Sequence, residues 1–196
     1  AQLHLKDQEL HYLKKQIHPH FLFNALNTIY GFALKQSLQT PDIILKLSNL
    51  LDYILYQVTE KEVFLKQELD HIEEYVSLEQ IRFQDTLEVA IAKNDFDESI
   101  RVPPMLFLPF VENAFKHGHI IDGKLQIHMK FEVSTKQLYF TIENTTRSEE
   151  TESDTSRIGL ANIRKRLELL YPDNYDLQVE TPKNRYAVTL KIRLND

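Results

Sequence analysis

The hydrophobic periodicity of the chain changes after Phe83, and this change constrains the fold more than any other feature. Before it, apolar residues recur every three or four positions, as at Ile43, Leu47 and Leu50, a spacing that predicts amphipathic helices. From Leu87 onward, short stretches alternate apolar and polar residues, which is typical of strands. The sequence therefore predicts a helical N-terminal part followed by a part that contains a sheet.

Length and composition leave room for one or two domains. The chain has 196 residues, of which 42% are hydrophobic, enough for one core and a helical appendage. No window approaches the roughly 18 apolar residues of a membrane span, and the N-terminus lacks the layout of a signal peptide. The absence of cysteine excludes disulfides and fits a reducing cytoplasm, and a net charge of −6 argues against nucleic-acid binding.

Residues 1–62 are predicted to form an antiparallel helical hairpin. The first helix is expected to run to about Lys35 with a kink beside Pro19, which cannot donate a backbone hydrogen bond. Residues 37–40 turn the chain, and Thr40 is expected to cap a second helix. Because two amphipathic helices bury little surface alone, we expect pairing with a second copy into a dimeric four-helix bundle, hence a homodimer.

Residues 63–196 are predicted to form an α+β layer, a single sheet of about five strands with three helices on one face. The expected helices cover residues 68–83, 105–118 and 158–170, and the expected strands cover residues 87–91, 125–133, 137–144, 175–180 and 186–193. Between them, residues 143–157 contain no glycine, proline or large apolar side chain, so they are predicted to form a mobile loop.

The stretch from residue 16 to 27, Gln-Ile-His-Pro-His-Phe-Leu-Phe-Asn-Ala-Leu-Asn, carries the first candidate functional residues. At about 100° per residue, His20, Asn24 and Asn27 fall on one polar stripe of a helix whose other faces are apolar. An ordinary histidine has a pKa of about 6.5, so at neutral pH its imidazole usually offers a lone pair. His20 is therefore a candidate nucleophile, with Asn24 one turn away as a hydrogen-bond partner.

A second stretch, residues 111–118, reads Val-Glu-Asn-Ala-Phe-Lys-His-Gly and places polar groups in an otherwise apolar helix. Mg²⁺ prefers oxygen ligands and keeps several waters, so the amide oxygen of Asn113 together with nucleotide phosphates makes a sufficient site. Lys116 suits the charge of the phosphates. The alternative is a solvated helix end with chance polar residues.

The first stretch resembles the Pro-His-Phe-Leu-Phe-Asn-x-Leu-Asn signature of the sensor histidine kinases related to the LytS and YehU proteins. Every position of that signature matches. The resemblance implies that His20, and not His18, accepts a phosphoryl group.

The second stretch resembles the N box of the Bergerat-fold ATPases and kinases. By that resemblance Asn113 holds Mg²⁺, Lys116 and His117 approach the phosphates of ATP, and Glu112 polarises or orients the reacting group. Asn24 and Glu112 are then both candidate hydrogen-bond partners of the histidine.

Two further segments resemble the glycine boxes of the same fold, each with a departure. Asn144 stands where the family commonly has an Asp that accepts the adenine amino proton, and it can accept through its amide oxygen. The segment from Arg157 through Gly159 and Leu160 to Asn162 resembles a Gly-x-Gly-Leu-x-Asn box at the start of a helix, where backbone amides meet phosphate. Arg157 replaces its first glycine, and either clamps the γ-phosphate or marks a lid that closes incompletely.

The resemblance covers nearly the whole chain and implies the cytoplasmic core of a two-component sensor histidine kinase. Such a core phosphorylates its own histidine from Mg-ATP and passes the phosphoryl group to an Asp of a response regulator, typically one with a LytTR DNA-binding domain. It implies a dimerisation and phosphoacceptor hairpin in residues 1–62 and an ATP-binding domain in residues 63–196. It also implies a membrane-embedded sensor upstream of Ala1, anchored in the inner membrane.

Two rival functions stay open. A catalytically degenerate dimer module would bind its regulator without ATP turnover, a reading motivated by Asn144, Thr146 and Arg157. A Bergerat-fold ATPase that acts on client proteins would hydrolyse ATP even after loss of His20. Acid-labile phosphate on the protein distinguishes the kinase from the degenerate module.

Overall fold

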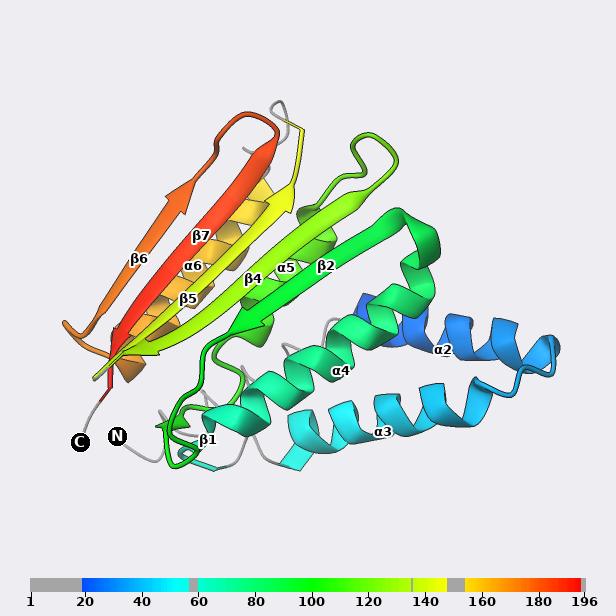
Figure 1. Cartoon of the computed structure of the whole chain (residues 1–196), viewed down its shortest axis with the longest axis horizontal. Coiled ribbons are helices and arrows are strands. Elements are labelled where there is room, and N and C mark those ends of the chain that lie inside the picture. The colour runs from blue at the N-terminus through cyan, green and yellow to red at the C-terminus, as the bar shows by residue number, and fades with distance from the viewer. Residues whose placement is uncertain (1–18, 57–59, 135, 148–153, 195–196) are drawn as a thin grey trace. The chain divides into compact units, whose positions relative to one another are not determined.

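A computed structural model describes residues 19–56, 60–134, 136–147 and 154–194, and for residues 19–20 and 154–158 it describes the backbone only. The chain folds into two compact units (Figure 1). The first comprises Ala1–Gln84 and Glu98–Phe107, and the second comprises Asp85–Asp97 and Leu108–Asp196.

The first unit is built on three helices. Helices α2 (Pro19–Leu34) and α3 (Thr40–Tyr56) form the predicted antiparallel hairpin, and α4 (Leu65–Phe83) packs against both (Figure 1). The turn between α2 and α3 includes Gln36, whose φ is 52°. The bundle with a second copy stays a prediction.

The start of α3 differs from the prediction that Thr40 caps it. The Gln39 carbonyl already accepts the first helical hydrogen bond, from the Ile43 amide at 3.1 Å, and the Ser37 hydroxyl accepts from the Gln39 amide at 3.3 Å. Thr40 Oγ1 is buried and has no hydrogen-bond partner among the described residues. Gln39 is thus the residue that precedes the helix, and Thr40 does not cap it.

Apolar side chains of the three helices form the core of the first unit. The predicted stripe of α3 is buried at Ile43, Leu47, Leu50 and Ile54, while its last predicted member, Val58, lies outside the described residues. Phe21 of α2 stacks on Tyr75 of α4, with ring centroids 4.6 Å apart. This stack holds the first turns of α2 against α4.

A buried carboxylate holds the segment that returns from the sheet to the first unit. Glu68 Oε1 accepts from the Met105 amide at 2.5 Å, and Oε2 accepts from the Leu106 amide at 3.0 Å. Nearby, the short strands β1 (Val63–Phe64) and β3 (Arg101–Val102) pair antiparallel. The sequence did not predict this two-stranded sheet, because two residues are too few to show a period.

The second unit contains a five-stranded mixed sheet in the order β2-β4-β5-β7-β6. Strands β2 and β4 are parallel, and all other pairs are antiparallel. Helices α5 (Leu108–His117) and α6 (Asp154–Leu170) lie on one face of the sheet (Figure 1). The strands are β2 (Leu87–Lys93), β4 (Leu125–Ser134), β5 (Gln137–Thr145), β6 (Tyr175–Glu180) and β7 (Arg185–Arg193), and the 3₁₀ helix η2 (Gln84–Thr86) precedes β2.

Three predicted boundaries differ from the structure. Helix α5 begins at Leu108 and not at residue 105, because Met105 has a φ of 55°, which no α-helix allows. Helix α6 begins at Asp154, so the loop predicted for residues 143–157 is shorter at both ends; its residues 148–153 lie outside the described part. The third predicted helix, α4, groups with the first unit through its contacts with α2 and α3.

The chain leaving α5 approaches strand β4 very closely at Gly118. A Cβ atom there would overlap the carbonyl oxygen of Ala114 and would lie 2.5 Å from Cδ1 of Leu125, which is itself buried. Only glycine fits this approach without displacement of the backbone.

Gly118→Ala is expected to destabilise the second unit by about 1–3 kcal/mol, the usual cost of overpacking. Gly31→Ala in α2 is the matched control, because a Cβ there meets no atom within 4 Å. That control should stabilise its helix by about 0.5–1 kcal/mol, since alanine is the better helix former. Urea unfolding followed by circular dichroism measures both changes, and a Gly118→Ala protein as stable as the wild type would contradict the close approach.

Candidate functional site

Helix α2 of the first unit carries two of the predicted catalytic residues. His20 is its second residue, and Asn24 follows one turn later; the imidazole lies outside the described side chains. The Asn24 carbonyl accepts a hydrogen bond from the Thr28 hydroxyl at 2.9 Å. Pro19 is the first described residue of α2, and the predicted kink involves preceding residues outside the described part.

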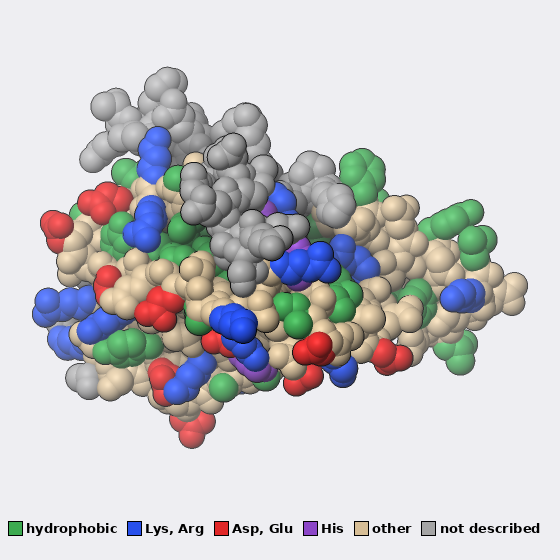
Figure 2. Space-filling model, turned by 90° about the horizontal axis from the view of Figure 1, so that it is seen from above, with side chains coloured by type: hydrophobic (Ala, Val, Ile, Leu, Met, Phe, Trp, Pro, Cys, Tyr) green, Lys and Arg blue, Asp and Glu red, His purple; other side chains and the backbone are tan. Residues whose placement is uncertain are grey.

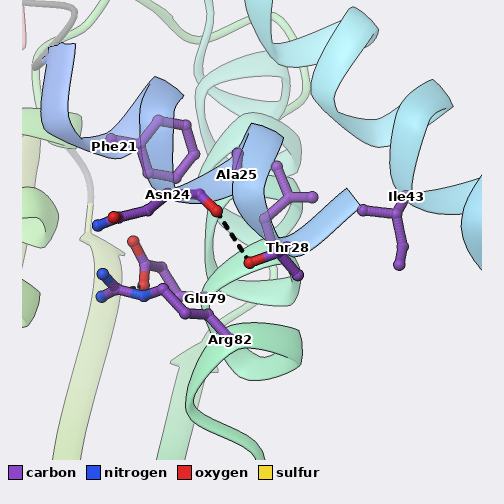
Figure 3. A pocket seen from close by; sticks show the side chains of 8 residues that line it. Phe21, Asn24, Ala25, Thr28, Ile43, Glu79 and Arg82 are labelled. Carbon is purple, nitrogen blue, oxygen red and sulfur yellow. Dashed lines mark hydrogen bonds and ion pairs between the residues drawn. The ribbon is translucent and has the colours of Figure 1, made fainter. Parts of the chain in front are cut away.

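The side chain of Asn24 lines a pocket of about 260 Å³, open solvent included, within the first unit (Figure 3). Glu79 and Arg82 of α4 line the same pocket, and their side chains pair with 2.5 Å between Arg82 Nη2 and Glu79 Oε2. The sequence analysis did not single out these two residues. The available signal was a glutamate among apolar α4 positions with an arginine three residues later, a spacing that places both on one helix face.

In the second unit, the predicted Mg²⁺ ligand on α5 lies beside the glycine box on α6. A Cβ atom on Gly159 would lie 3.4 Å from Oδ1 and 3.5 Å from Nδ2 of Asn113. Two segments 46 positions apart in the sequence therefore meet at the Asn113 amide. Because Gly159 has no side chain, nothing from that position covers the amide oxygen.

Asn144 lies beside Gly118, the residue that directly follows the C-terminal end of α5. Its side chain is 3% exposed, and its Nδ2 donates to the Thr145 carbonyl at 3.1 Å. A Cβ atom on Gly118 would lie 3.5 Å from that Nδ2. The N-box stretch, residues 111–118, therefore lies beside both glycine-box segments, at Asn113 with Gly159 and at Gly118 with Asn144.

Hydrogen bonds fix the end of β5 to the chain that leaves α5. The Thr145 hydroxyl donates to the His119 carbonyl at 2.8 Å, and the His119 amide donates to the Thr145 carbonyl at 2.8 Å. The Gln126 amide donates to the Thr145 hydroxyl at 3.1 Å. Asn144 thus stands on a rigid strand end.

The remaining predicted residues of α5 differ in exposure. Glu112 is buried, with 7% of its surface exposed, while Lys116 is exposed and His117, the last residue of the helix, is half-buried. An exposed ammonium one turn after Asn113 can meet a phosphate without losing contact with water.

The glycine box of α6 departs from one expectation. Because α6 begins at Asp154, the amides of Gly159 and Leu160 lie beyond its first four residues and bond within the helix. The box thus lies within α6, and its contact with phosphate stays a prediction. Asn162 is exposed, and the side chain of Arg157 lies outside the described residues, so both readings of Arg157 stay open.

The residues present fit a magnesium–nucleotide complex. The amide oxygen of half-buried Asn113 is a hard ligand of the kind that Mg²⁺ accepts, with phosphates and water able to complete its coordination. The predicted catalytic residues are divided between the units, since His20 and Asn24 belong to the first and Glu112 to the second. Within the described ranges no helix has both the length and the hydropathy needed to cross a membrane.

Comparisons with known proteins agree with these motifs. A model of the histidine kinase family matches residues 8–87. The sensor histidine kinase BtsS of Escherichia coli (strain K12) is 32% identical over 196 residues, which cover 98% of this chain and 34% of BtsS. The sensor protein LytS of Staphylococcus epidermidis is 28% identical over 202 residues, which cover 96% of this chain and 34% of LytS. The chain spans about a third of the length of these curated relatives.

Among solved structures, the histidine kinase domain of the blue-light activated histidine kinase of Erythrobacter litoralis EL346 is similar, with a TM-score of 0.53 at 16% identity. The match covers 96% of this chain and 95% of that domain. At this identity the likeness shows the fold alone, and it confirms the α+β architecture. The family match and the two relatives show that the chain is similar to sensor histidine kinases, LytS among them.

Proposed function

We propose that this chain is the cytoplasmic core of a two-component histidine kinase that phosphorylates His20 from Mg-ATP. The observation that carries the proposal is the contact of Asn113, in the middle of α5, with Gly159, together with the position of Asn144 beside Gly118, just after the C-terminal end of α5. Three segments distant in sequence thus lie around the second half of α5 with the chemistry that a magnesium–nucleotide complex needs.

In this proposal the second unit binds and orients ATP. Bound Mg²⁺ neutralises phosphate charge, and the amide oxygen of Asn113 is its protein ligand. Lys116 and His117 face the phosphates, where the Lys116 ammonium offsets their charge. Asn144 accepts from the adenine amino group through Oδ1, because its Nδ2 already donates to the backbone.

The first unit supplies the acceptor. A ring nitrogen of His20 attacks the γ-phosphorus, an N–P bond forms as the bond to the β–γ bridging oxygen breaks, and ADP leaves. Asn24, one turn later on α2, orients the imidazole, and Glu112 is a second candidate for that role. The phosphoryl group then passes to an Asp carboxylate of a response regulator, which we expect to be of the LytTR type.

We further propose that the protein is a homodimer through the α2–α3 hairpin, with residues 1–62 as the dimerisation and phosphoacceptor part and residues 63–196 as the ATP-binding part. Large apolar side chains stay exposed on this hairpin (Figure 2). On α2 they recur at spacings of three and four residues, which forms one stripe suited to a bundle. The exposed residues are Phe23, Leu26, Tyr30, Leu34, Ile44, Leu45, Leu55 and Tyr56.

The chain is proposed to continue upstream into a sensor anchored in the inner membrane, so that residues 1–196 lie in the cytoplasm. The two sensor proteins are about three times as long as the part that this chain matches, which supports the proposal of a further sensor region. The regulator, and not this acidic chain, would contact DNA.

Incubation with Mg²⁺ and γ-labelled ATP is expected to place acid-labile label on the protein, and His20→Gln should abolish that label because it removes the acceptor. His18→Gln is the matched control and should still be labelled. Label that persists on His20→Gln would exclude His20, and an unlabelled wild type would favour the degenerate module. Transfer of label to a purified receiver domain tests the regulator step.

Leu26→Glu is expected to weaken dimerisation about tenfold or more, because it places a carboxylate in the proposed apolar seam of the bundle. Leu169→Glu is the control, since Leu169 is an exposed apolar residue of α6 in the second unit. Sedimentation equilibrium measures the dimer dissociation constant. Equal constants for Leu26→Glu and the wild type would remove α2 from the interface.

Asn144→Asp is expected to tighten ATP binding severalfold, since a carboxylate only accepts and a charged acceptor adds about 1 kcal/mol over a neutral one. The same change should lower thermal stability, because the donor to the Thr145 carbonyl is lost. Titration calorimetry with ATP decides the first point. A variant that binds ATP no better, or worse, would place adenine away from Asn144.

A further inference from the structure

The pocket beside α2 contains a polar cluster within apolar surroundings (Figure 3). Its apolar walls include Phe21 and Leu78, whereas Asn24 of α2 and the Glu79–Arg82 pair of α4 bring an amide and two opposite charges. All of these residues belong to the first unit. The cluster therefore lies where the helix that carries His20 packs on α4.

Glu79 has a charged and a polar neighbour. The residue is 3% exposed, Arg82 Nη2 lies 2.5 Å from its Oε2, and the Tyr75 hydroxyl hydrogen bonds to its side chain. Oε2 forms an ion pair with Arg82 but has no hydrogen-bond partner among the described residues. Burial raises the pKa of Glu79, while Arg82 and Tyr75 oppose that rise. Arg82 also stacks on the Phe83 ring at 4.4 Å, and its Nε has no hydrogen-bond partner in the described ranges.

Packing alone does not explain this pair. The Glu79 side chain is 4% exposed and that of Arg82 is 29% exposed, so the carboxylate bears most of the desolvation cost of the pair. Replacing a largely buried ion pair with apolar side chains of similar volume is often neutral or stabilising. The neighbouring buried positions of α4, Ile72, Val76 and Leu78, are apolar. An apolar pair at positions 79 and 82 would therefore serve the core at least as well.

The Glu79–Arg82 pair lies next to helix α2, with which it shares the pocket. Tyr75, which hydrogen bonds to Glu79, also stacks on Phe21 at 4.6 Å, and Phe21 directly follows His20. Asn24, one turn after His20, lines the pocket together with Glu79 and Arg82. The first two turns of α2 are thus held by a stacked ring on α4 and by the polar cluster beside it.

We propose that Glu79 and Arg82 are positioning residues for the phosphorylation of His20: the pair fixes the first two turns of α2 through Tyr75 and Phe21 and through Asn24. The inference rests on the proposed kinase function. A nucleophile displaced by about 1 Å from its productive position loses roughly a hundredfold in rate, so a support of this kind affects turnover directly. ATP binding depends on the second unit and does not depend on the pair.

The decisive variant is the double substitution Glu79→Leu and Arg82→Met, which removes both charges and keeps the volume. It is expected to fold with an unchanged or higher melting temperature, since no unpaired charge remains. Its kcat for autophosphorylation should fall about tenfold or more, with the KM for ATP within about twofold of the wild type. If the pair only stabilised the fold, the substitution would not lower kcat while KM and the melting temperature stay unchanged.

Two single variants complete the test. Glu79→Gln keeps the shape and removes the charge, and it should also lower kcat without a change in KM. Glu73→Gln, an exposed glutamate on the same helix, should leave both constants unchanged. The readout is the initial rate of acid-labile labelling over a range of ATP concentrations.

A double variant labelled at the wild-type rate would overturn the inference. If the double variant does not fold, Glu79→Gln decides: a wild-type kcat overturns the inference, and a reduced kcat at unchanged KM and melting temperature supports it. An unlabelled wild type would defeat the proposed function and this inference together. Equal labelling of wild type and variants would defeat this inference alone.

Discussion

The carboxylate of Glu68 is the interaction on which the arrangement of the first unit depends. Its two oxygens bind the amides of Met105 and Leu106, and so hold the returning segment in a backbone conformation with a positive φ at Met105. A left-handed methionine costs free energy that these charge-assisted bonds offset. Phe107 is the only residue between this fixed turn and α5, so the N-box helix starts directly from an anchored point.

In the second unit, a small residue decides how closely two of the functional segments meet. Gly118 allows the chain after α5 to lie against Leu125 and Asn144, and a side chain there would displace its neighbours. A Cβ atom on Gly159 would make ordinary van der Waals contact with the Asn113 amide. Gly118 therefore acts here through its size, because the requirement is close approach and its φ is not positive.

Sequence periodicity predicted all five strands of the large sheet to within about two residues, and it predicted the α2–α3 hairpin and α5, because each has a long buried face. Periodicity did not predict where helices α3 and α6 begin, because local side-chain chemistry sets those ends. The start of α6 was missed because Asp154, Thr155 and Ser156 favour a helix start but carry no apolar pattern. Thr40 was assigned a cap that it does not form, because the first helical hydrogen bond already goes to the Gln39 carbonyl. The motifs located Asn113 and Gly159, but only folding shows that they touch.

The Glu79–Arg82 pair was missed for a different reason: its meaning depends on which helix lies opposite. On sequence alone, a glutamate and an arginine three positions apart describe a solvated helix face, and only the packing of α2 over α4 turns that face inward. Both units bury charged side chains, Glu112 and Arg166 in the second and Glu68 and Glu79 in the first. At the proposed nucleotide site, Asn113 and Asn144 are neutral amides, which do not repel the phosphates of an anionic ligand, whereas Glu79 lies beside the helix that carries His20.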